Sequence, residues 1–263
     1  MKKQNLPSII KKESHILLKK VVSKSYLISI KKDMIKVMSQ FVKIENNLSI
    51  DKQLDCAFTS ITDLSPKLRS NIYKVMSSLS CLSNLCNLPK IKKILKELKF
   101  KVPRNLGSAL FAMEPKKNNY LLQPHQDIRN KIVSNHAINL WFPLTEGENI
   151  GGVMVYPGSH NSGPLKHQIC KKTGKVTVKK KILNNFKKKK EIKNFCVGDI
   201  LLFHPYTIHT SIKNTGNKIR WTSSFCVDDA ARSPQLKDNF QPYKQSDFIT
   251  ELSNEQLYSL KNK

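Results

Sequence analysis

The residues with the clearest potential for chemistry are a histidine and an aspartate two positions apart, in Pro124-His125-Gln126-Asp127. Side chains alternate along an extended segment, so His125 and Asp127 point to one face and leave the far side of a shared metal open. The best candidate for a third ligand is His209, just after the strand-like run Asp199–Phe203. Two histidines and one carboxylate form the facial triad of non-haem Fe(II) oxygenases. A His-x-Asp pair alone also fits a surface turn, because short motifs carry a false-positive risk.

The chain length and charge limit the possible functions. The 263 residues suffice for one large domain or two small ones, and a hydrophobic content of 39% supports a folded core. The formal net charge of +27 fits a polyanionic partner such as nucleic acid or a membrane surface. However, the lysines are spread over most of the chain, and Asn and Ile, whose codons are also AT-rich, are abundant. We therefore favour compositional bias over a nucleic-acid function, while allowing an anionic substrate.

The six cysteines show no Cys-x-x-Cys or other paired spacing, which disfavours a zinc finger or a disulfide scaffold. We expect reduced, mostly buried thiols in a cytoplasmic protein. The basic start Met1–Asn5 is not followed by a sustained apolar region. The sequence therefore predicts neither a signal peptide nor a transmembrane segment.

Residues 1–100 have the periodicity of a helical portion that packs on the core. Leu27–Ile44 has apolar residues at helical spacing, and two further helices are expected to begin at Ser65-Pro66 and at Pro89. Apolar stripes of this kind usually face a core. Binding of these lysine-bearing helices to a membrane surface is the alternative.

From about residue 105 the pattern changes to short β-rich runs separated by Pro, Gly, Asn and Asp. These runs are Gly107–Met113, Ala137–Phe142, Val153–Tyr156, Asp199–Phe203 and Arg220–Val227. Many short strands without intervening helices favour an antiparallel sandwich or jelly roll. We thus predict a mostly β chain of α+β class, with a double-stranded β-helix (cupin-like) core over 101–263. A Lys-rich insertion at 166–193 is expected to be a solvated excursion, with steering of a negative substrate as the alternative.

The motifs follow one another in a characteristic order. They are His125-Gln126-Asp127, Asn139–Leu144, the Gly-Gly strand ending in Pro157-Gly158-Ser159-His160, His209, and Arg220–Phe225. Over residues 105–230 this order resembles the phytanoyl-CoA dioxygenase (PhyH) family of Fe(II)/2-oxoglutarate-dependent oxygenases. The combination of both metal motifs in register with Pro-Gly-Ser-His is specific.

The resemblance implies roles for individual residues. His125, Asp127 and His209 would hold Fe(II), and Arg220, eleven residues after His209, would bind the far carboxylate of 2-oxoglutarate through its planar fork. Thr222 lies on the same strand face as Arg220 and would donate a hydroxyl hydrogen bond. Further co-substrate contacts are expected from Trp141 and Asn139. Supporting roles beside the ligands are expected for His160, Ser211 and Gln123.

His204 competes with His209 as the third ligand, since it lies only five residues earlier. In the family pattern the ligand is the later histidine, followed by a small residue and a serine, as in His209-Thr210-Ser211. The spacing to Arg220 also selects His209. His136 and His167 are expected to be ordinary surface residues.

The implied reaction uses O2 and 2-oxoglutarate, releases succinate and CO2, and hydroxylates or otherwise oxidises a C–H bond of a small molecule. Related halogenases lack the carboxylate, so the presence of Asp127 predicts oxidation rather than chlorination. One alternative is a nucleic-acid demethylase, which we disfavour because Cys226 stands where a second arginine is expected. A non-enzymatic ligand-binding jelly roll is another, and it would be expected to lack a ligand or the arginine. The sequence specifies neither the substrate nor the oligomeric state.

Overall fold

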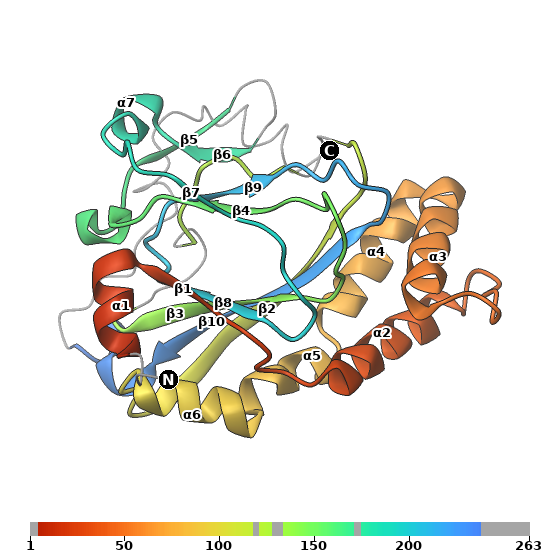
Figure 1. Ribbon diagram of the computed structural model, residues 1–263, viewed down its shortest axis with the longest axis horizontal. Helices are drawn as coiled ribbons and strands as arrows, with labels where there is room; N and C mark the ends of the chain where they lie inside the picture. The colour runs from red at the N-terminus through yellow and green to blue at the C-terminus, as the bar shows by residue number, and fades with distance from the viewer. Residues whose placement is uncertain (1–4, 118–120, 128–133, 171–174, 238–263) are drawn as a thin grey trace.

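A computed structural model describes residues 5–117, 121–127, 134–170 and 175–237. Its core is a pair of antiparallel sheets (Figure 1). The larger sheet has the order β1-β8-β3-β10-β2. Its strands are β1 (His15–Leu18), β8 (Ile200–Phe203), β3 (Ala137–Pro143), β10 (Arg220–Asp229) and β2 (Pro103–Met113). The five predicted β-rich runs all fall on strands of the two sheets, with ends shifted by a few residues.

The smaller sheet has the order β7-β4-β9, with β7 at Lys190–Ile192, β4 at Gly152–Val155 and β9 at His209–Ile212. Beyond β9, an isolated antiparallel bridge joins His125 to His209. This bridge brings the segment that contains the His-x-Asp pair against the first residue of β9. The sequence patterns did not identify β9 as a strand.

Alternation along β10 separates packing residues from cavity residues. Trp221 and Phe225 belong to the large hydrophobic cluster shared with the helices. Arg220, Thr222 and Ser224, at the intervening positions, line a cavity between the two sheets. A period of two is what an extended strand imposes on its side chains. One strand therefore supplies both core and pocket.

Helices cover the outer face of the larger sheet (Figure 1). They are α2 (Lys24–Met38), α3 (Ile50–Leu64), α4 (Pro66–Ser77), α5 (Ser80–Ser83) and α6 (Pro89–Glu97), whereas α1 (Leu6–Glu13) precedes β1. The predicted starts at Ser65-Pro66 and Pro89 agree with α4 and α6, and the Ser65 side chain accepts a hydrogen bond from the Leu68 amide. The predicted helix at Leu27–Ile44 ends at Met38. Phe58 of α3 packs edge-on against Trp221, with ring centroids 4.8 Å apart.

The first hundred residues are not purely helical, because β1 pairs with β8 along the edge of the larger sheet. Four residues are too few to give a clear strand signal beside strong helical patterns. The largest core cluster runs without interruption from the helices into the sheet. The helices and the larger sheet therefore share one hydrophobic cluster.

The Lys-rich insertion contains regular structure rather than only a solvated excursion. It forms a hairpin of β5 (His167–Ile169) and β6 (Val176–Val178), then α7 (Lys180–Leu183) and β7. Val178 and Ile192 are buried and anchor it. Short 3-10 turns lie at Asn84–Asn87, Ser159–Ser162, Ala230–Arg232 and Pro234–Leu236.

No disulfide joins any of the six cysteines, and the expectation that most of them are buried was wrong. Cys226 is buried, Cys56 and Cys196 are exposed, and the others are partly exposed. Within the described ranges, no helix has the length and apolar character needed to cross a membrane.

Candidate metal centre

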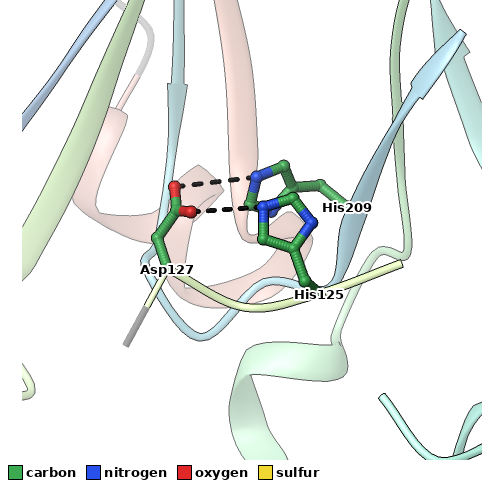
Figure 2. A group of neighbouring side chains, drawn as sticks. All are labelled: His125, Asp127 and His209. Carbon is green, nitrogen blue, oxygen red and sulfur yellow. Dashed lines mark ion pairs between the residues drawn. The ribbon is translucent and has the colours of Figure 1, made fainter. Parts of the chain in front are cut away.

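His125, Asp127 and His209 point toward one another (Figure 2), and all three line the inter-sheet cavity. Nε2 of His125 lies 3.4 Å from Oδ1 of Asp127, and Nε2 of His209 lies 3.6 Å from Oδ2 of Asp127. One ligand atom from each residue lies within 4.8 Å of the other two. In the part of the chain that the structure describes, this is the one such cluster of at least three His, Cys, Asp or Glu side chains. Its composition is that of a two-histidine, one-carboxylate iron site.

Backbone carbonyls orient both imidazoles. Nδ1 of His125 donates to the carbonyl of Gln123 at 2.7 Å, and Nδ1 of His209 donates to the carbonyl of Thr207 at 3.0 Å. A carbonyl can only accept, so each Nδ1 carries the proton and each Nε2 presents a lone pair toward Asp127. This is how proteins usually fix the tautomer of metal-binding histidines. Gln123 therefore acts through its main chain.

The main chain also holds the two histidines in register. The His125 amide donates to the His209 carbonyl at 2.9 Å, and the His209 amide donates to the His125 carbonyl at 3.0 Å. Next to this pair, the Ser211 amide donates to the Leu122 carbonyl at 3.2 Å. The Ser211 side chain lines the cavity and its hydroxyl accepts from the Leu122 amide. The metal-binding geometry is thus built from paired backbone rather than from a flexible loop.

Burial keeps His209 neutral. Desolvation lowers the pKa of His209 to about 4, the neighbouring His125 adds to the shift, and Asp127 opposes it. A neutral imidazole is the form that binds a metal. At neutral pH this ligand therefore needs no deprotonation before it binds iron.

Asn139, which was expected to contact the co-substrate, forms a hydrogen bond with a candidate metal ligand instead. Its side-chain amide donates to Oδ2 of Asp127 at 2.8 Å. Trp141, two residues along β3, does line the cavity and packs against Phe195, with ring centroids 4.5 Å apart. The two side chains share a strand face as predicted, but only Trp141 borders the cavity.

Arg220 is a buried cation that lacks a protein counter-anion within the described ranges. It is 5% exposed, and Nη1 donates to the carbonyls of Ile150 (3.3 Å), Gly152 (3.1 Å) and Ile212 (3.1 Å). Its Nε is buried and has no hydrogen-bond partner, and desolvation lowers the pKa of the group to about 10. A buried, uncompensated charge is costly. The guanidinium is therefore suited to receive the carboxylate of a bound ligand.

The cavity joins the metal cluster to Arg220. Its volume is about 380 Å³, within the range typical of small-molecule sites. His125, Asp127 and His209 border it together with Arg220 and the buried Thr222. A chelating acid with a second carboxylate fits this combination, because one end meets the metal and the other meets a cation.

His204 and His160 lie in a different cavity from the metal cluster. His204 is buried, Nδ1 accepts from the Tyr206 amide at 3.1 Å, and desolvation lowers its pKa to about 4. His160 hydrogen bonds the Lys11 carbonyl at 3.1 Å, and its ring centroid lies 5.4 Å from that of His204. The structure therefore places His160 against His204 rather than beside the metal cluster.

Sequence reasoning missed two residues that support the centre, Gln126 and His167. Gln126 is 1% exposed and His167 is 3% exposed, so the expectation of a surface position for His167 was wrong. The Gln126 amide N–H donates to Nε2 of His167 at 3.0 Å. The alternation that places both ligands on one face also places Gln126 on the opposite, inward face. The sequence therefore contained a signal for the burial of Gln126. It contained no signal that His167 would be its partner.

These features define a class of protein: an antiparallel double sheet that carries a two-histidine, one-carboxylate cluster in the lining of an inter-sheet cavity. The sequence profile of the phytanoyl-CoA dioxygenase (PhyH) family matches residues 17–222. The chain belongs to this family and is an Fe(II)/2-oxoglutarate-dependent oxygenase. A search of curated proteins gives no match.

Solved structures support the fold. The carbocyclase SnoK from nogalamycin biosynthesis is 16% identical, with a TM-score of 0.56, over 87% of this chain and 84% of SnoK. The epimerase SnoN, in complex with Fe3+, alpha ketoglutarate and nogalamycin RO, is 14% identical with a TM-score of 0.59, over 95% of each chain. EctD from S. alaskensis, with 2-oxoglutarate and 5-hydroxyectoine, is 14% identical with a TM-score of 0.59, over 88% of this chain and 77% of EctD. The predicted fold class is thus confirmed.

Proposed function

We propose that the protein oxidises a C–H bond of a small organic molecule, with His125, Asp127 and His209 holding Fe(II). Arg220, assisted by the Thr222 hydroxyl, binds the far carboxylate of 2-oxoglutarate. The observation that carries this proposal is the single cavity that joins the three-residue cluster to a buried guanidinium without a protein counter-anion among the described residues. The comparisons give no support to a nucleic-acid demethylase or a non-enzymatic binding protein.

The residues contribute geometry and charge to the reaction. When bound, Fe(II) supplies the coupling between oxidative decarboxylation of 2-oxoglutarate by O2, which gives succinate and CO2, and oxidation of the substrate. Asn139 holds the Asp127 carboxylate in one orientation. Apolar side chains of Trp141, Val153 and Phe203 border the same cavity and limit water there.

The carboxylate of Asp127 also restricts the outcome of the reaction. It occupies the position that a halide needs in related halogenases. We therefore propose hydroxylation, desaturation or another oxidation rather than chlorination.

The size of the cavity and the known neighbours support a small-molecule substrate. Among the similar structures, SnoN binds nogalamycin RO and EctD binds 5-hydroxyectoine. A cavity of about 380 Å³ shared with 2-oxoglutarate accommodates a ligand of comparable size. A natural product, a lipid fragment or a sugar is consistent with these dimensions.

The charges around the cavity favour an anionic substrate. Arg69 and Lys175 line it in addition to Arg220, and Arg69 pairs with Glu114 at 3.2 Å, a carboxylate that also pairs with Lys117. A lining that includes Arg69, Lys175 and Arg220 favours the entry of an anion into the cavity.

We also propose a cytoplasmic location. None of the six cysteines forms a disulfide, although two of them are exposed. Free, accessible thiols are typical of a reducing compartment.

The test is anaerobic titration of the metal-free protein with Fe(II) and then 2-oxoglutarate, followed by succinate measurement in air with a metabolite library. We expect one Fe(II) and one 2-oxoglutarate per chain, and faster succinate release with a subset of acidic metabolites. Single-stranded methylated DNA should not stimulate turnover. Absence of stoichiometric Fe(II)-dependent 2-oxoglutarate binding would contradict the proposal.

A further inference from the structure

The β5–β6 hairpin contacts the segment that carries two of the candidate metal ligands. The Val178 amide donates to the Pro124 carbonyl at 2.7 Å, and the Thr177 hydroxyl donates to the same carbonyl at 3.0 Å. Pro124 immediately precedes His125. On its other side this segment pairs with β9 through the His125–His209 bridge. The segment is therefore held between β9 and the hairpin of the Lys-rich insertion.

A histidine at the start of β5 makes the contact closest to the ligands. Nδ1 of His167 donates to the Leu165 carbonyl at 2.8 Å, so Nε2 is unprotonated and accepts the Gln126 amide N–H at 3.0 Å. Gln126 is the residue between His125 and Asp127. The N–H of Gln126 belongs to the peptide unit that follows His125, so this bond fixes the plane of that peptide. A fixed peptide plane restricts the directions of the Cα–Cβ bonds on either side of it.

The Gln126 side chain completes the anchor on the face away from the metal cluster. Its amide group donates to the carbonyls of Gly163 (3.0 Å) and Tyr206 (2.7 Å), and its carbonyl accepts from the Leu165 amide at 2.8 Å. Leu165 thus bonds both His167 and Gln126. With Gln126 and His167 almost fully buried, loss of the imidazole acceptor would leave the Gln126 N–H without a partner inside the protein. Such a group costs about 1–3 kcal/mol and favours displacement of the backbone.

We infer that His167 is a positioning residue of the metal centre: its Nε2, acting through the Gln126 amide, holds His125 and Asp127 in the geometry that binds iron. This inference rests on the proposed function, because it takes these residues as iron ligands. It makes the Lys-rich insertion part of the metal centre.

The test compares Fe(II) affinity of the full chain, measured anaerobically, with the thermal unfolding of the metal-free protein. His167→Leu removes the acceptor, and we expect Fe(II) to bind roughly 10–100-fold more weakly, the usual effect of losing an outer hydrogen-bond partner. His167→Gln places an oxygen near the Nε2 position and should restore affinity to within a few-fold. The matched control is His15→Leu, a histidine that is also 3% exposed and whose Nδ1 bonds a backbone carbonyl. It should lower thermal stability without changing iron affinity.

If His167→Leu does not fold, His167→Asn replaces it, because its oxygen lies near the Nδ1 position and cannot reach the Gln126 amide. Weak iron binding by Asn with retained binding by Gln supports the inference. Equal affinities of the two, or a loss that only follows thermal stability as in His15→Leu, overturns it. Failure of the unmodified protein to bind Fe(II) would overturn both the inference and the proposed function, so the two failures are distinguishable.

Discussion

Asn139 donates its side-chain amide to Oδ2 of Asp127 at 2.8 Å. The bond links a buried central strand of the larger sheet to a candidate metal ligand that lies outside both sheets. Asn139 itself is 1% exposed and its main chain pairs with both neighbouring strands, so its position is rigid. The orientation of the Asp127 carboxylate is therefore set by the core.

Replacing Asn139 by Leu should weaken Fe(II) binding roughly 10–100-fold, because the carboxylate loses the donor that orients it. Anaerobic Fe(II) titration measures the change. Ser224→Ala, which lies on the adjacent strand and also faces the cavity, is the control and should bind Fe(II) normally. Unchanged iron affinity in Asn139→Leu would remove Asn139 from the metal centre.

Replacing Arg220 by Met should raise the dissociation constant for 2-oxoglutarate while Fe(II) affinity stays the same. Removing one partner of a buried charge pair costs about 2–5 kcal/mol, which corresponds to at least a roughly 30-fold loss of affinity. Arg220→Lys should recover only part of it, because Lys lacks the bidentate fork. Normal 2-oxoglutarate binding in the Met variant would exclude Arg220 as its anchor.

Replacing Lys175 by Met should raise the KM for an acidic substrate roughly 10-fold or more, since a hydrogen bond to a charged group contributes about 1.5–3 kcal/mol. Burial lowers the pKa of Lys175, and its Nζ lies 2.9 Å from the Leu121 carbonyl. Lys175→Arg should keep a low KM. Steady-state kinetics with the substrate identified in the library would test this prediction. An increase confined to the KM for 2-oxoglutarate would contradict a role of Lys175 in binding the acidic substrate.

The stability of the metal-free protein should fall as the pH decreases from about 6.5 to about 4. Burial lowers the pKa of His204 from 6.5 to about 4, so the unfolded chain binds its proton first. The contribution of this residue is complete above pH 6.5 and is lost toward pH 4, with a size of about 3 kcal/mol. His204→Asn retains an acceptor for the Tyr206 amide and should reduce the dependence of the unfolding free energy on pH. Urea unfolding at several pH values measures this free energy. The same pH dependence in the unmodified protein and in His204→Asn would refute the prediction.

Much of the fold and site follows from the sequence because it depends on local patterns. The spacing of His125 and Asp127, and the eleven residues from His209 to Arg220, select residues that the structure brings to one cavity. The period-two pattern of β10 assigns its two faces correctly. Helix starts at Ser65-Pro66 and Pro89 are also encoded by nearby residues.

The remaining features depend on contacts between distant segments. Pairing of β1 with β8, 180 or more residues apart, leaves no local signal in four residues. The hydrogen bond between Asn139 and Asp127 requires the position of the His-x-Asp segment relative to β3. Likewise, His167 is buried only because its hairpin folds back onto Gln126.

The most direct test of the account is succinate formation and anaerobic 2-oxoglutarate binding by Asp127→Ala, compared with the unmodified protein. We expect the variant to fold, to bind Fe(II) at least roughly 10-fold more weakly, and to lose nearly all succinate formation, because only two ligands remain. Full succinate formation by Asp127→Ala would contradict the assignment of the metal centre.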